Sequence, residues 1–143
     1  MKITQLSVFL ENRKGRLYDV CALLGRNKIN IRALTIAETP EFGILRVIVD
    51  KPEETRKILK ENNFVANITD IVAAEVPDKS GGLAEILKIL NDNNVNIEYM
   101  YGFVERSTDK AVMVFRFEDP DKAIGVLTKN SIKIIGSKDM GAI

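Results

Sequence analysis

The segment Asn12–Ile31 reads NRKGRLYDVCALLGRNKINI and combines a glycine, a helical apolar pattern and an Asn-Ile pair. Its apolar residues recur at the i, i+3, i+4 and i+7 spacing of one helical face, namely Leu17, Val20, Cys21 and Leu24. Gly15 stands where the helix is expected to begin, and Asn30 and Ile31 stand just after its expected end. The segment therefore predicts a loop, a helix and the start of a β-strand.

The same order of features returns in Asp78–Ile97, DKSGGLAEILKILNDNNVNI. Gly81 lies 66 positions after Gly15, and Asn96 lies 66 positions after Asn30. Other pairs at this spacing are Leu17 with Leu83, Leu24 with Leu90, Asn27 with Asn93, and Ile31 with Ile97. Chance similarity between two amphipathic helices explains matches in the apolar stripe, but not the matched glycines and asparagines outside it. The fixed period indicates an internal duplication.

β-rich segments and a second helix surround both copies in the same order. LSVFL alternates ahead of the first helix, and strand-like pairs joined by the short connections ETPEFG and RSTDK follow the two helices. Pro52 and Pro120 stand near the start of a second helix in each copy, and the runs FVANI and IKIIGS close the copies. The order βαββαβ, twice, predicts an α+β fold of two ferredoxin-like units packed side by side, with antiparallel sheets and helices on one face.

No linker rich in glycine, proline or serine separates the copies. The junction NNFVANITDIVAAEVP is nearly continuous strand-like sequence, so the boundary is expected between Asn67 and Asp70. We therefore predict domains at residues 1–68 and 69–143, which should dock and fold together because small units bury little surface alone.

Composition excludes several classes of function. The chain has no histidine and one cysteine, Cys21, which argues against zinc sites, disulfides and catalytic Ser-His or Cys-His pairs. The 21 basic and 20 acidic residues give a net charge of +1, which offers no general attraction to nucleic acid or acidic membranes. Neither a signal peptide nor an apolar run of membrane-spanning length appears. These features predict a non-catalytic cytoplasmic protein without metal or cofactor.

The two glycine loops and the two asparagines are the candidate binding features. The first N–H groups of a helix lack internal partners and attract an anion, although the glycines can equally serve only to make the turn. Asn30 and Asn96 offer a donor and an acceptor, which suits an α-amino acid, or they can close a turn onto their own backbone. Neither loop matches the phosphate-binding or dinucleotide-binding glycine patterns.

The stretches FLENRKGRLYDVCALLGRNKINI and EVPDKSGGLAEILKILNDNNVNI resemble the opening half of the ACT domain, a regulatory βαββαβ module of amino-acid metabolism. The resemblance covers nearly the whole chain as two tandem copies, and the chain looks like the stand-alone tandem ACT proteins. It implies a sensor that binds an amino acid or related carboxylate at the seam between two domains and regulates a partner. Many family members carry proline before the loop glycine, where this chain has Lys14 and Ser80.

Carried over residue by residue, the resemblance implies two sets of ligand-binding residues. The first set is Asn12, Arg13, Lys14, Gly15, Arg16, Leu17, Asn30 and Ile31. The second set is Asp78, Ser80, Gly81, Gly82, Leu83, Asn96 and Ile97. Arg13, Lys14 and Arg16 can add positive charge near the first loop or form a solvated cluster.

Two further patterns bear on partners. GILRVIVD is apolar on both faces, so its second face needs a cover, and we predict a homodimer. Tyr99, Met100, Tyr101 and Phe103 form a cluster of three aromatic side chains and one methionine that favours packing in a core or interface. Two alternatives stay open: an RNA-binding ferredoxin-like protein that uses this cluster, and a protein-interaction module with empty pockets.

Overall fold

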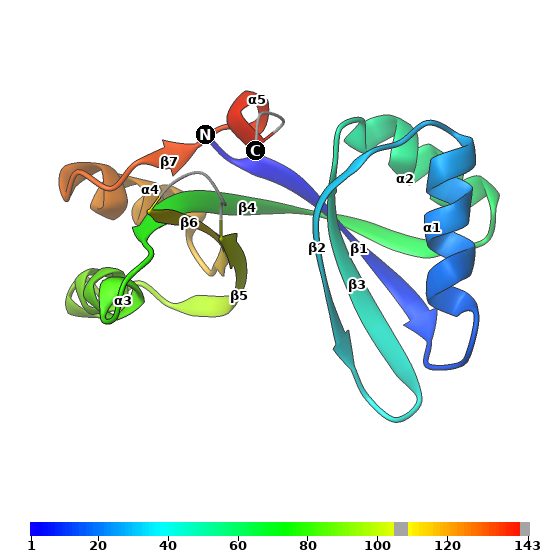
Figure 1. The fold of residues 1–143 in the computed structure, drawn as a ribbon, viewed down its shortest axis with the longest axis horizontal. Helices are drawn as coiled ribbons and strands as arrows, with labels where there is room; N and C mark the ends of the chain where they lie inside the picture. The colour runs from blue at the N-terminus through cyan, green and yellow to red at the C-terminus, as the bar shows by residue number, and fades with distance from the viewer. Residues whose placement is uncertain (105–108, 141–143) are drawn as a thin grey trace. The chain divides into compact units, whose positions relative to one another are not determined.

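The computed structural model describes residues 1–104 and 109–140 (Figure 1). Its elements are β1 (Ile3–Glu11), α1 (Arg16–Arg26), β2 (Ile31–Glu38), β3 (Phe42–Val49), α2 (Pro52–Glu61), β4 (Val65–Pro77), α3 (Gly82–Asp92), β5 (Ile97–Val104), β6 (Lys110–Phe117), α4 (Pro120–Lys129), β7 (Ile134–Ile135) and α5 (Ser137–Met140). Most of the predicted connection RSTDK lies outside the described residues. The α+β class and the βαββαβ order of both copies are confirmed.

The chain divides into two compact units. Thr4–Thr69 form the first unit, and Met1–Ile3 together with Asp70–Ile143 form the second unit. Strand β4 runs without a break through this division, so its residues 65–69 belong to the first unit and 70–77 to the second. One strand thus ends one βαββαβ motif and begins the next.

In the first unit the strands follow the order β2-β3-β1-β4, and both helices cover the same face of this sheet (Figure 1). β1 and β3 are antiparallel, with Leu6 opposite Val47 and Val8 opposite Leu45. These four side chains are buried and meet α1 and α2 in one core. Alternate residues of a strand face opposite sides, so the sequence alternation places this core on the helix side.

In the second unit the order is β5-β6-β4, and β7 pairs with β4. Val72 and Ala74 of β4 and Phe115 and Phe117 of β6 lie on one face and are buried against α3 and α4. The rings of Phe115 and Phe117 stack with centroids 5.2 Å apart. The duplicated sequence therefore builds the same layered arrangement twice.

The end of the second unit differs from the first. Only Ile134 and Ile135 of the predicted run IKIIGS form a strand, and the short helix α5 follows at Ser137. Met140 of α5 is buried. A four-residue helix shows too little periodicity to be predicted from its sequence.

Helices α1 to α4 all end in the same way. Each has an asparagine at its C-cap whose side-chain amide donates to the carbonyl four residues earlier, and these residues are Asn27, Asn62, Asn93 and Asn130. A residue with a left-handed backbone follows each cap, namely Lys28, Asn63, Asn94 and Ser131. The repeated Asn27–Asn93 match thus reflects helix termination rather than ligand binding.

The start of α4 gives a test of local stability. The carboxylate of Asp119 accepts a hydrogen bond of 3.1 Å from the backbone N–H of Lys122, whereas Lys51 at the start of α2 makes no side-chain cap. We expect Asp119→Ala to lower the free energy of unfolding by about 1 kcal/mol. Urea denaturation measures this loss, and Lys51→Ala is the control; equal losses would contradict the capping role.

Candidate functional site

The loop between β1 and α1 turns on a left-handed glycine. Gly15 is the N-cap of α1, with φ of 93° and ψ of −18°, and no side chain caps the helix. Gly81 holds the same position before α3, with φ of 82° and ψ of −7°. Residues other than glycine adopt this left-handed backbone conformation only at a cost in free energy. Both glycines are therefore required by the turn itself.

The two loops also make the same set of backbone hydrogen bonds, each within its own unit. Each loop has a bond between residues two apart, a turn bond into the helix start, the first helical bond and a bond to the following hairpin. In the first unit these are Arg13 N to Glu11 O (2.8 Å), Arg16 N to Arg13 O (3.4 Å), Asp19 N to Gly15 O (2.8 Å) and Asn12 N to Glu41 O (3.0 Å). In the second they are Lys79 N to Pro77 O (3.0 Å), Gly82 N to Lys79 O (3.0 Å), Glu85 N to Gly81 O (3.1 Å) and Asp78 N to Asp109 O (2.8 Å).

This conformation leaves the first turn of each helix without a side-chain cap. The N–H groups of a first turn point along the helix axis, and the helix dipole places partial positive charge there. A carboxylate is the natural ligand for such an end. The loop residues Asn12–Leu17 and Asp78–Leu83 lead into and open these helix starts, and the Asn12 side-chain amide donates to the Thr39 carbonyl (3.0 Å).

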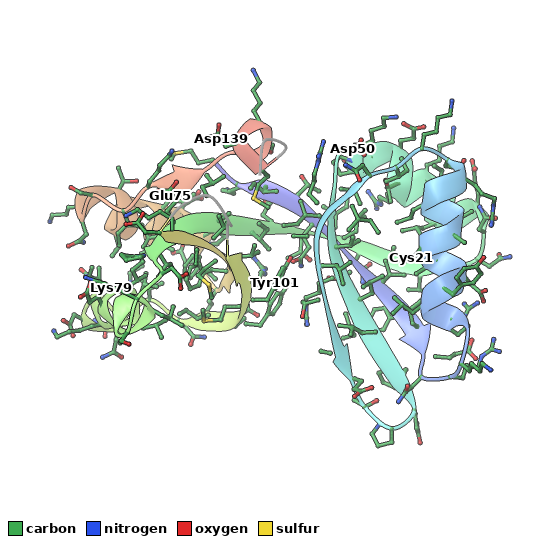
Figure 2. All side chains as sticks on the ribbon, viewed as in Figure 1. Cys21, Asp50, Glu75, Lys79, Tyr101 and Asp139 are labelled. Carbon is green, nitrogen blue, oxygen red and sulfur yellow. The ribbon has the colours of Figure 1, made fainter. Side chains whose placement is uncertain are left out.

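The two arginines of the first loop already have partners. The Arg13 guanidinium lies 2.8 Å from the Glu11 carboxylate, and that of Arg16 lies 3.4 Å from the Asp19 carboxylate. Arg16 also lies over the Phe64 ring, 4.7 Å from its centroid. Lys79 in the second loop, labelled in Figure 2, lies 4.0 Å from Glu85. The arginines thus interact with their own unit rather than extending freely into the loop.

The asparagine-isoleucine pairs lie at the opposite end of their units from the loops. The loop after β1 and the start of β2 flank opposite ends of α1 in Figure 1. In the sheet, Glu11 lies opposite Phe42, whereas Ile31 lies opposite Val49. Seven residues of strand correspond to about 23 Å. One unit therefore does not bring its glycine loop and its asparagine together.

An acidic residue accompanies each asparagine. The Asn30 N–H donates to the Asp50 carboxylate (3.0 Å), and the Asp50 N–H donates to the Asn30 carbonyl (3.1 Å). The Asn96 side-chain amide donates to the Glu118 carboxylate (3.2 Å), and the Glu118 N–H donates to the Asn96 carbonyl (3.2 Å). The asparagines therefore join the start of one strand to the end of its neighbour.

Asp50 and Glu118 were not among the residues predicted from the sequence. They occupy matching places before the proline of the second helix, in VDKP and FEDP, so the repeat carried a usable signal. An open hollow of about 460 Å³ lies beside Asn96 and is also lined by Glu118, Asp119 and Lys122. Figure 2 labels Asp50 in the first unit, beyond the end of α1 opposite its loop. This end of each unit carries carboxylates, and it also carries a lysine, because the ammonium of Lys51 donates to the Lys28 carbonyl and that of Lys122 donates to the Asn94 carbonyl.

The two isoleucines of the Asn-Ile pairs, the cluster around Tyr99 and the second face of β3 are at least partly buried in the described residues. Ile31 and Ile97 are half-buried and pack against the cores of their own units. Tyr99 and Tyr101 are half-buried, and Met100 packs against the second core, while the side chain of Phe103 lies outside the described part. Ile48 is buried and Ile44 is half-buried on the second face of β3.

The thiol, the acidic residues and the helices of the described part bear on nucleophilic chemistry, metal binding and membrane insertion. Cys21 packs against the first core, and burial raises the pKa of its thiol, which disfavours the reactive thiolate. Residues 1–104 and 109–140 contain no group of three or more His, Cys, Asp or Glu able to hold a metal. Within the same ranges, no helix has the length and apolar character to cross a bilayer.

Comparison with known proteins identifies a matching family and several similar solved structures. The family described as ACT domain pair matches residues 1–143. The crystal structure of protein BT0572 from Bacteroides thetaiotaomicron is 43% identical, with a TM-score of 0.93 over 98% of this chain and 96% of that chain. The ligand-free regulatory subunit of aspartate kinase from Thermus thermophilus is 14% identical, with a TM-score of 0.63 over 88% of this chain and 91% of that chain.

The regulatory subunit of aspartate kinase from Thermus flavus is also 14% identical, with a TM-score of 0.61 over 88% of this chain and 90% of that chain. At this identity the likeness to the two kinase subunits concerns the fold. No curated protein matches the chain.

Proposed function

We propose, from the fact that the chain belongs to the ACT domain pair family, that it is a non-catalytic sensor of an amino acid or related small carboxylate. ACT domains are regulatory domains that bind small molecules, and the aspartate kinase subunits of the same fold are themselves regulatory. The observation that carries the proposal is that α1 and α3 begin in the same way, each after a left-handed glycine, Gly15 or Gly81, and without a side-chain cap. A cytoplasmic location and a regulated partner belong to the same proposal.

The ligand would bind at a seam between two ACT domains. We place the domains at residues 1–68 and 69–143. A free α-amino acid carries a carboxylate and an ammonium group. The loop end of a unit suits the carboxylate, and the end with Asn30 and Asp50, or with Asn96 and Glu118, suits the ammonium. Because one unit keeps these ends about 23 Å apart, a complete site needs the loop of one domain and the asparagine of another. A homodimer would supply such pairs.

A thermal-shift screen of the full chain against the twenty amino acids, each at millimolar concentration, tests this proposal. Ligand at about 100 times its Kd stabilises a protein by about 2.7 kcal/mol, so the matching amino acid should raise Tm clearly. No shift with any amino acid would contradict amino-acid sensing and favour the protein-interaction module.

The loops are tested by the double variant Gly15→Val and Gly81→Val. We expect it to lose the ligand-induced shift, because valine both blocks the approach to the helix start and strains a turn with positive φ. The strain costs about 1–2 kcal/mol at each turn, so each variant is compared with its own ligand-free Tm. Gly125→Val on α4, where a side chain meets open space, is the control that should keep the shift. A full shift in the double variant would exclude the loops as the site.

A further inference from the structure

A basic surface surrounds Phe64 on the first unit. Two open hollows of about 260 Å³ each share Phe64 as a wall. Arg16 and Arg26 line the hollow beside α1, and Arg56 and Lys60 line the hollow beside α2. Asp19 is the only acidic residue among the lining residues of either hollow. We call the two hollows together the Phe64 groove.

Three of the four cations are available to a partner. Arg26, Arg56 and Lys60 are exposed, and within the described residues none of them lies within 4.0 Å of a carboxylate. Arg16 is different, because its guanidinium lies over Phe64 and near Asp19. Arg16 therefore packs inside the groove against Phe64, whereas Arg26, Arg56 and Lys60 are exposed cations without a neutralising carboxylate nearby.

The second unit provides an internal comparison. A hollow of about 290 Å³ lies at the matching place, where Ile132 replaces Phe64 and Asn130 replaces Asn62. Its charged lining is balanced, with Glu75 and Glu85 against Lys110 and Lys133. The Lys133 ammonium lies 3.6 Å from the Glu75 carboxylate. The positions that match the four cations of the first unit are Gly82, Asp92, Ile124 and Thr128. The hollow is therefore present in both units, whereas the net positive charge of its lining is found in the first unit.

The geometry points to an extended acidic segment of a partner protein as the occupant of the Phe64 groove. Guanidinium groups bind carboxylates through paired hydrogen bonds, and the cations are spread over two neighbouring open hollows rather than one enclosed cavity. Tyr18 and Val65 line the hollows and are 75% and 62% exposed, so they can take apolar side chains between the acids. A stacked nucleobase fits less well, because Arg16 already covers a face of Phe64.

This surface shares Arg16 with the proposed amino-acid site but otherwise lies outside it, and it is tested separately through Arg56 and Lys60. The probe is a fluorescein-labelled ten-residue peptide of alternating Glu and Leu, titrated with the full chain at low salt and followed by anisotropy. We expect Arg56→Glu with Lys60→Glu to weaken binding at least about tenfold, because both changes place repulsion in the groove. Lys129→Glu with Lys138→Glu makes the same change in net charge at exposed positions of the second unit and should alter binding less than about twofold.

Three results would overturn the inference. Absence of peptide binding at low salt would contradict the inference. Equal weakening of peptide affinity by the two double variants would show that the peptide is bound only by general charge attraction. The third result is that a ten-nucleotide RNA binds more tightly than the peptide and that Arg56→Glu with Lys60→Glu abolishes this RNA binding. The groove would then be a nucleic-acid surface instead. The Tm response of the groove variant to amino acids should be normal, so failure of the groove and failure of the sensor are distinguishable.

Discussion

Phe115→Ala is expected to lower the free energy of unfolding by about 4 kcal/mol. Phe115 is fully buried in the second core, opposite Val72 of β4, and its ring stacks on that of Phe117 at 5.2 Å. Removal of the ring leaves a cavity lined by strands and helices that relax only partly, so lost transfer energy and lost packing add together. Urea denaturation of the purified chain measures the change.

The matched control for this prediction is Phe9→Ala. Phe9 lies on β1 with 41% of its surface exposed, so the same truncation removes less buried area there. We expect a loss of less than half that of Phe115→Ala. Similar losses for both variants would show that Phe115 does not occupy a tightly packed core.

The repeat and its periodicity were sufficient to predict the fold, because helices, hairpins and sheet faces are specified by local patterns. The apolar stripe of the first helix predicts burial less well at the start of the helix. Leu24 is buried, whereas Leu17, the first member of the same stripe, is 43% exposed in the first turn of α1. Spacing identifies a helical face but does not say how far the sheet beneath it extends.

The candidate site was predictable only in part. The loops around Gly15 and Gly81 were located because glycine at a helix start has a local backbone signature. The distance from each loop to Asn30 or Asn96 depends on strand register, which joins residues distant in sequence. The Phe64 groove was not predicted for the same reason, since Arg16, Arg56 and Phe64 come from separate segments.

The second glycine of SGGL shows how sequence and structure differ in their explanations. Both Gly81 and Gly82 were expected to make a turn or admit a ligand. Gly81 has the left-handed backbone, whereas a Cβ atom on Gly82 would lie 2.1 Å from the carbonyl oxygen of Pro77. Arg16 holds the matching position in the first loop, so this close approach belongs to the second loop alone.

We therefore expect Gly82→Ala to lower the free energy of unfolding by about 3 kcal/mol, because a methyl group at this position displaces the backbone of Pro77. Gly125→Ala is the control. Gly125 lies within α4 with open space around it, and alanine there should stabilise the chain by up to about 1 kcal/mol through helix propensity. Urea midpoints of the two variants should move in opposite directions from that of the parent chain. A Gly82→Ala variant as stable as the parent would show that the contact with Pro77 is easily relieved, and Gly82 would then be free to serve the ligand.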